Sequence, residues 1–178
     1  ILSLQDGGFL VAWHGNPEIS AQRFDQNGQK VGSQFAVSSS RLVELSDGEL
    51  LAVWKVSGNG SYDDEYHAQL YDQLGNETGT SFPVATTGDD VQSADAVALP
   101  DGGFVVVWQS DKVGGGRWDI YGQRFDSNGT QDGAEFVVKS STVTDFGNPS
   151  ITMLSDGGFV VVWATDELDG DGWGVFGQ

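Results

Sequence analysis

A ten-residue segment that ends in tryptophan occurs four times in this chain of 178 residues. The third copy reads LPDGGFVVVW and the fourth reads LSDGGFVVVW, whereas the first two read LQDGGFLVAW and LSDGELLAVW. Their final residues, Trp13, Trp54, Trp108 and Trp163, are 41, 54 and 55 residues apart. A repeat of this length constrains the fold more than any local motif does, because every copy has to form the same structural unit.

Each unit contains four short segments with the composition of β-strands. The first ends at an Asp-Gly pair, whose glycine supplies the positive φ angle of a two-residue hairpin turn. The second is the apolar run, and in Phe104–Trp108 both alternating faces are apolar, so we expect both faces to be buried and the four tryptophans to belong to the core.

The third segment contains a glutamine that always follows Ala or Gly, and the fourth comes after a turn that reads Asp-x-Asn-Gly in two units. We interpret the small residue as room for the close approach of a neighbouring sheet, and the glutamine as a partner for buried backbone groups. The glutamines are Gln22, Gln69, Gln123 and Gln178.

Four short antiparallel strands with two buried faces predict a blade between blades, and therefore an all-β, β-propeller-like fold. The units are 1–40, 41–93, 94–148 and 149–178, and the last lacks its fourth strand. Because propellers have about 4–8 blades, we expect about half a ring per chain, completed by a second copy in a homodimer or by a longer parent chain. An open array of small sheets is the alternative.

The charge balance excludes several classes of partner. Twenty-six acidic residues against eight basic ones give a formal charge of −18, which disfavours nucleic acid and anionic membranes.

The chain has no cysteine, which excludes disulfides and thiolate metal sites. No apolar run reaches the length of a membrane span, so we expect no membrane insertion. Without an initiator methionine and with a strand at its end, the chain is expected to be a piece of a longer protein.

The segment DGGFVVVWQSD, followed by DIYGQRFDSNG, resembles tandem repeats of large secreted and surface proteins of bacteria, the hemolysin-type calcium-binding and giant adhesin proteins. The resemblance spans nearly the whole chain and is clearest in the third and fourth units. It implies an extracellular or cell-surface, non-enzymatic module with calcium dependence, and it implies no catalytic residues. The Gly-Gly-x-Gly-x-Asp motif of the calcium β-roll is absent from this sequence.

Chemistry is expected in the loops that follow each tryptophan, because there the units differ most. In the fourth unit, Asp166, Asp169 and Asp171 lie at short spacings, and glycines follow the last two, which suits an oxygen-preferring cation such as calcium. A solvated acidic loop is the alternative, and no cofactor is required. Trp118 and Trp173 occupy equivalent positions five residues before the glutamine, where each either stacks on a sugar ring or packs on its blade.

These observations favour a structural or adhesive module that is not an enzyme, with a glycan or a cell-surface protein as its partner. A carbohydrate-binding propeller that uses Trp118 and Trp173 is the first alternative. A glycoside-active enzyme is the second, because a pair of carboxylates about 5–10 Å apart can hydrolyse glycosides. His14 and His67 lie in non-equivalent places with no catalytic motif beside them.

We predict that excess chelator lowers the melting temperature if Asp166, Asp169 and Asp171 bind calcium. An ion that binds to the native state and not to the unfolded chain stabilises the native state by mass action. The measurement is the melting curve recorded with and without chelator. An unchanged curve would show that the fourth unit does not bind calcium.

Overall fold

The computed structural model describes residues 1–16, 18–39, 41–57, 64–85, 90–112, 117–140, 146–166 and 172–178. These residues form fifteen strands in four antiparallel sheets, which we call blades 1 to 4. They include no helix of the length and apolarity that crossing a membrane would require. The predicted all-β class is therefore confirmed.

The strands follow the repeat in strict order, so each blade is one continuous segment of chain. Blade 1 consists of β1 (Leu2–Ser3), β2 (Phe9–His14), β3 (Ile19–Phe24) and β4 (Lys30–Val37). Blade 2 consists of β5 (Leu42–Glu44), β6 (Leu50–Val56), β7 (Glu65–Tyr71) and β8 (Glu77–Pro83). Blade 3 consists of β9 (Val91–Ala98), β10 (Phe104–Ser110), β11 (Asp119–Phe125) and β12 (Phe136–Lys139). Blade 4 consists of β13 (Phe146–Met153), β14 (Phe159–Asp166) and β15 (Trp173–Gly177).

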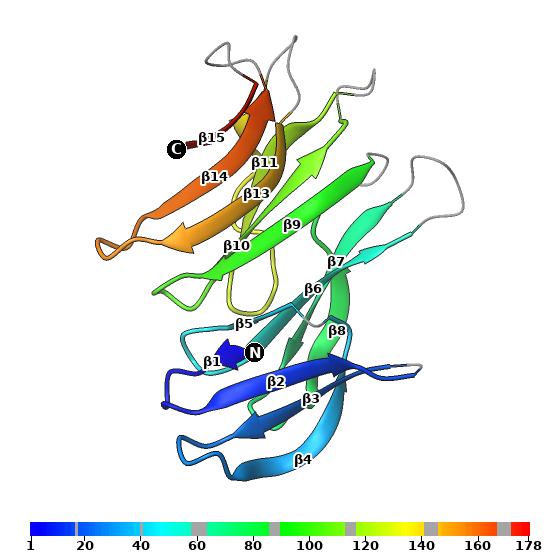
Figure 1. Cartoon of the computed structure of the whole chain (residues 1–178), viewed down its shortest axis with the longest axis vertical. Coiled ribbons are helices and arrows are strands. Elements are labelled where there is room, and N and C mark those ends of the chain that lie inside the picture. Colours follow the sequence, from blue (N-terminus) through cyan, green and yellow to red (C-terminus); the bar gives the residue numbers. More distant parts are fainter. Residues whose placement is uncertain are drawn as a thin grey trace.

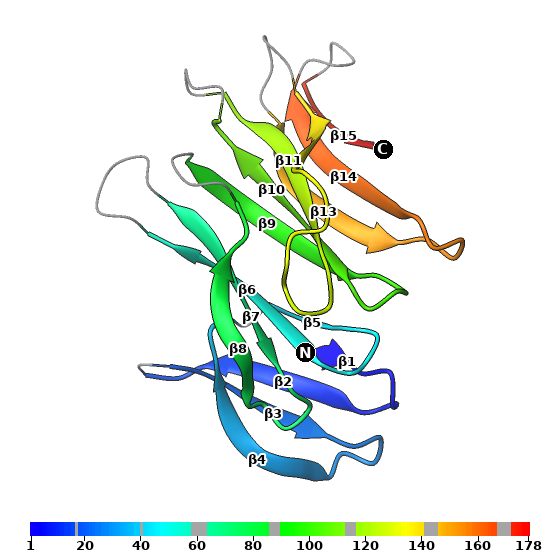
Figure 2. The same cartoon turned by 180° about the vertical axis from the view of Figure 1, so that it is seen from behind.

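The blades succeed one another from the N-terminal end of the molecule to its C-terminal end (Figures 1 and 2). Strand β1 contacts β5, β5 contacts β9, and β9 contacts β13. The first strand of every blade therefore lies on a common inner side, where strands of a propeller surround its axis. Strands β9 and β13 begin at Val91 and Phe146, ahead of the unit boundaries expected at 94 and 149.

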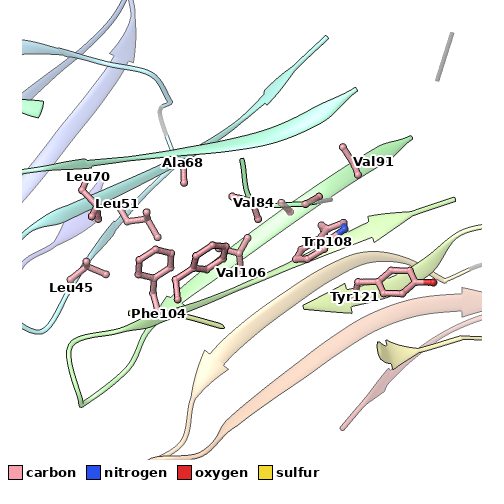
Figure 3. Packing of buried hydrophobic residues seen from close by; sticks show 13 residues of the cluster. Leu45, Leu51, Ala68, Leu70, Val84, Val91, Phe104, Val106, Trp108 and Tyr121 are labelled. Carbon is pink, nitrogen blue, oxygen red and sulfur yellow. The ribbon is translucent and has the colours of Figure 1, made fainter. Parts of the chain in front are cut away.

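Three apolar clusters join the blades, and their members show which face of each strand meets which neighbour. In β10, Phe104, Val106 and Trp108 pack against blade 2, together with residues such as Leu51 and Leu70 (Figure 3). The intervening residues of β10, Val105 and Val107, pack instead against blade 4, in the cluster that contains Val161 and Trp163. Both faces of this strand are thus buried, as its apolar pattern predicts.

The tryptophan of each unit belongs to the face that meets the preceding blade, and its burial depends on whether such a blade exists. Trp108 and Trp163 are 1% and 4% exposed, and Trp54 is half-buried against blade 1. Trp13 is 39% exposed, because none of the described strands packs on that side of blade 1. The expectation that all four tryptophans belong to the core is therefore wrong for Trp13.

The repeated glutamine acts as predicted in blades 1 to 3, whereas Gln178 of blade 4 is exposed. Gln22, Gln69 and Gln123 are buried, and each side-chain amide donates a hydrogen bond to the carbonyl of the next residue. Gln22 and Gln69 donate a second one to a carbonyl of the outer strand, and Gln123 donates it to the carbonyl of Gly133, ahead of β12.

The small residue before the glutamine faces the neighbouring blade in blade 2, where Ala68 is buried in the cluster shared with blade 3, but Gly122 of blade 3 differs. A Cβ atom at Gly122 would collide with the ring of Phe136, which comes from the outer strand of the same blade rather than from a neighbouring sheet.

The Asp-Gly turns have the predicted positive φ but are one residue longer than predicted. In the first unit Leu4 N–H donates to Gly8 O at 3.0 Å, and Gly7 N–H donates to Leu4 O at 3.1 Å. Three residues, 5–7, therefore connect the strands, with Gly7 at a φ of 84°. The carboxylate of Asp6 accepts the Gly8 N–H at 2.8 Å, which fixes the turn and explains why aspartate precedes the glycine.

We predict that Trp108→Ala lowers the free energy of unfolding by about 3–5 kcal/mol, because it empties a fully buried indole site. Trp13→Ala serves as the matched control, since it removes the same residue from the same repeat position on an open face. Its cost is expected to be about 1 kcal/mol or less. Urea unfolding followed by circular dichroism, at a concentration where the chain is monomeric, measures both; equal losses would contradict the assignment of the two faces.

Candidate functional site

A cavity of about 730 Å³ opens where the four blades meet on the inner side of the molecule. Residues of all four blades line it, at the rim that carries the loop from β2 to β3 and the connection from β4 to β5. We call it the axial cavity. Its lining includes His14, Arg41, Trp54, Lys55, Tyr66, Asp95 and Ser150.

Three of these residues occupy one repeat position, four residues before the leucine that opens each ten-residue segment. The position holds Arg41 in blade 2, Asp95 in blade 3 and Ser150 in blade 4. The fold places them side by side, because the first strand of each blade contacts the first strand of the next. Positions that are equivalent in sequence thus become neighbours around the axis, and here their side chains differ.

Asp95 is the centre of this row. Its Oδ2 atom accepts hydrogen bonds from Ser150 Oγ at 2.8 Å and from Ile151 N–H at 3.1 Å. Its Oδ1 atom accepts the Ala96 N–H at 3.1 Å and lies 3.9 Å from Arg41 Nη1. The carboxylate is therefore held in one orientation by donors from blades 3 and 4, with a guanidinium of blade 2 beside it.

The backbone beside this row is strained. Ser93 and Asn148 have φ angles of 42° and 51°, in a region that non-glycine residues seldom adopt, at a cost of about 1–3 kcal/mol each. They are equivalent in the repeat, they lie where the register of β9 and β13 shifts, and Ser93 Oγ donates to Asn148 Oδ1 at 3.2 Å. Such bulges redirect side chains, and both residues line the axial cavity.

Blade 2 adds aromatic and basic groups to the lining. Trp54 and Tyr66 are half-buried there. Burial raises the pKa of the Tyr66 phenol, so its hydroxyl stays protonated at neutral pH and can donate a hydrogen bond. Lys55 Nζ pairs with the Asp64 carboxylate. Aromatic faces with hydroxyl, carboxylate and guanidinium groups form a lining suited to a polar ligand that also has apolar faces.

Neither of the two predicted sugar-stacking residues, Trp118 and Trp173, lines the axial cavity. Trp118 is half-buried next to β11, and its carbonyl accepts the N–H of Phe146 from blade 4 at 2.8 Å. Trp173 begins β15 and is 69% exposed. Their positions are equivalent, and blade 4 adjoins Trp118, whereas none of the described strands follows blade 4 beside Trp173.

The predicted calcium ligands fall largely outside the described residues. Asp169 and Asp171 are not described, and Asp166 is described only as the backbone end of β14. Within the described ranges, no three His, Cys, Asp or Glu side chains gather as a metal site would require.

The expectation that function lies in the loops after each tryptophan missed Arg41, Asp95 and Ser150. A signal for them exists in the sequence, since a position four residues before a repeated leucine carries a cation, an anion and a hydroxyl in successive units. That variation stands out only when the inner strands are known to meet, and the repeat pattern alone does not show which strand is innermost.

The arrangement of blades is similar to that of several solved carbohydrate-active enzymes. An endo-arabinase from Bacteroides thetaiotaomicron matches with a TM-score of 0.55 and 14% identity, over 97% of this chain and 71% of the enzyme. A mutant α-L-arabinofuranosidase from Fusarium graminearum, solved with an iminosugar inhibitor, matches with a TM-score of 0.68 and 12% identity, over 99% and 60%. An α-L-arabinanase from Penicillium chrysogenum, solved with arabinobiose, matches with a TM-score of 0.59 and 16% identity, over 96% and 62%.

The chain has the fold of a partial β-propeller. It spans 60 to 71% of the lengths of these three enzymes. Neither a scan against protein-family models nor a search of curated proteins gave a match. The predicted propeller fold is confirmed, whereas the resemblance to hemolysin-type and adhesin repeats stays a prediction.

The expectation of a non-enzymatic, structural or adhesive module is wrong. Solved proteins with this arrangement of blades include arabinanases, arabinofuranosidases and other glycoside hydrolases, so the fold is one that carries enzymes. The error has a physical reason: the repeated segments on which the expectation rested form turns and buried strands, and these determine the scaffold rather than the chemistry at its axis.

Proposed function

We propose that this chain is part of a carbohydrate-active propeller of the glycoside-hydrolase type, with the axial cavity as its oligosaccharide site. One observation carries the proposal. The position at which the blades differ in charge converges on a cavity of about 730 Å³, within a fold similar to those of arabinan-degrading enzymes.

The lining supplies the groups that sugar binding needs. Sugars offer hydroxyls to charged and polar side chains and C–H faces to aromatic rings, and the cavity contains Asp95, Arg41 and Ser150 together with Trp54 and Tyr66. The hydrogen bonds from Ser150 Oγ and Ile151 N–H hold Asp95 in place before a ligand arrives. A group that is already oriented loses less entropy when it binds a sugar hydroxyl.

Hydrolysis makes a further demand, because glycosidases generally use two carboxylates about 5–10 Å apart. Among the described residues that line the cavity, Asp95 is the only carboxylate. We assign it one of the two roles, and the other requires an acid from outside this described lining. A polysaccharide substrate is met outside the cell, so the proposal includes an extracellular or cell-surface location.

The test is oligosaccharide binding by calorimetry and release of reducing sugar, with arabinan-, galactan- and polygalacturonate-derived substrates. Asp95→Asn keeps the shape of the side chain but removes its charge, and we expect at least a tenfold loss of binding and no hydrolysis. Trp173→Ala, outside the cavity, should leave both unchanged. Melting temperatures confirm that the variants fold.

Absence of binding to every glycan in the panel by the unmodified protein would refute the proposal. Loss of binding in Trp173→Ala but not in Asp95→Asn would transfer the site to the aromatic residues predicted from the sequence.

We also propose that a second copy of the chain covers the end faces. The open face of blade 1 carries Trp13. In blades 2 to 4 the equivalent face packs against the preceding blade. The open face of blade 4 carries Val162 and Val175, which are 38% and 77% exposed. Val162 is equivalent to Val107, which blade 4 buries completely. The two ends are thus the two halves of the interface that joins the blades, and β15 offers a strand edge without a partner among the described strands.

We predict a dimer mass by light scattering at high protein concentration, and a monomer for Val175→Glu, because a buried unpaired charge opposes association. Val137→Glu is the matched control, since Val137 is 56% exposed in β12, in the interior of the blade series. It should remain dimeric. A monomeric mass for the unmodified protein at high concentration would refute the proposed partner.

A further inference from the structure

Basic groups gather in the axial cavity although the chain as a whole is strongly acidic. The protein has eight Lys and Arg residues against 26 Asp and Glu residues. Arg41, Lys55 and His14 all line this one cavity, whereas Asp95 is the only carboxylate in its described lining. An anion is repelled by most of this surface, so the cavity that brings Arg41 and Lys55 together is where the chain can accept one.

Arg41 is the cation with donors to spare. Its Nη1 atom donates to the carbonyl of Ala94 at 2.9 Å, and the same atom lies 3.9 Å from Asp95 Oδ1. These contacts anchor one corner of the guanidinium, while 71% of the side chain remains exposed. The described residues provide no other hydrogen-bond acceptor for it, which leaves the N–H groups of Nε and Nη2 for a ligand.

The other charged groups of the lining are engaged. Lys55 Nζ pairs with the carboxylate of Asp64. Asp95 receives hydrogen bonds from Ser150 Oγ, Ile151 N–H and Ala96 N–H, and these donors compensate much of the charge that would otherwise repel an anion. The carboxylate also restrains Arg41 from one side, so the free edge of the guanidinium is pre-positioned.

We infer that Arg41 is the residue that selects the ligand, and that the ligand is an oligosaccharide bearing a carboxylate. A guanidinium presents two parallel N–H donors that match the two oxygens of a carboxylate, which gives a strong and directional contact that a sugar hydroxyl cannot reproduce. Trp54 and Tyr66 remain available for the sugar rings, and Ser150 for their hydroxyls. The inference rests on the proposed function and narrows its substrate to acidic sugars, whether uronic acids or sialic acids.

The experiment compares matched acidic and neutral ligands by calorimetry: trigalacturonate against galactotriose, and sialyllactose against lactose. The unmodified protein is expected to bind at least one acidic ligand at least tenfold more tightly than its neutral counterpart, and the arm that shows the preference identifies the source of the carboxylate. Arg41→Gln should reduce the preference to about onefold. Arg41→Lys should retain part of it, because an ammonium keeps the charge but loses the two-pronged geometry.

Lys30→Gln is the matched control, because it removes one positive charge from an exposed position of β4 and Lys30 does not line the axial cavity. It should leave the preference unchanged. Equal affinities of the unmodified protein for acidic and neutral ligands would overturn this inference and leave the proposed function standing, and this comparison needs no variant. If neither class binds, this inference fails, and the proposed function fails with it when the arabinan-derived substrates do not bind either.

Discussion

The structure depends on one apolar interface that is used three times. In each case one face of the second strand of a blade, with the pattern Phe-x-Val-x-Trp or Leu-x-Ala-x-Trp, packs on the blade before it. There it contacts the residues on the opposite face of the second strand, as Trp108 does on blade 2 and Trp163 on blade 3. A strand with two apolar faces cannot expose either face without cost, since each buried large side chain contributes about 1.5–3 kcal/mol. The repeat of the sequence is therefore a repeat of interfaces, and a single blade would have no stable existence apart from its neighbours.

The same interface explains why the residues of the candidate site lie where they do. Faces between blades must be alike for the series to continue, so they leave little freedom for chemistry. Buried glutamines such as Gln69 and Gln123 donate hydrogen bonds to carbonyls of their own blade, in the third strand and in the outer strand or just ahead of it. The inner rim is free of both constraints, and there the strained Ser93 and Asn148 and the row from Arg41 to Ser150 are found.

Much of the fold could be predicted from the sequence, because its signals are local. The apolar alternation of Phe104–Trp108 predicts two buried faces, the Asp-Gly pairs predict the turns, and Gln123 predicts its own hydrogen bonds. The site could not be predicted in the same way, since Arg41 and Asp95 are 54 residues apart in the chain and meet only because inner strands converge. The exposure of Trp13 was missed for a related reason: the pattern of one strand does not reveal whether a neighbouring blade exists.

The difference between equivalent residues is itself an argument about the ligand. A ring of identical side chains around an axis would present a symmetric surface, suited to a symmetric ligand such as a single ion. Arg41, Asp95 and Ser150 instead place a cation, an anion and a hydroxyl in sequence along successive blades, linked through Asp95 by contacts of 3.9 and 2.8 Å. A row of this kind has a direction. It suits a ligand whose two ends differ. A sugar chain is such a ligand, because it carries different groups on successive ring positions, whereas a single ion has no direction.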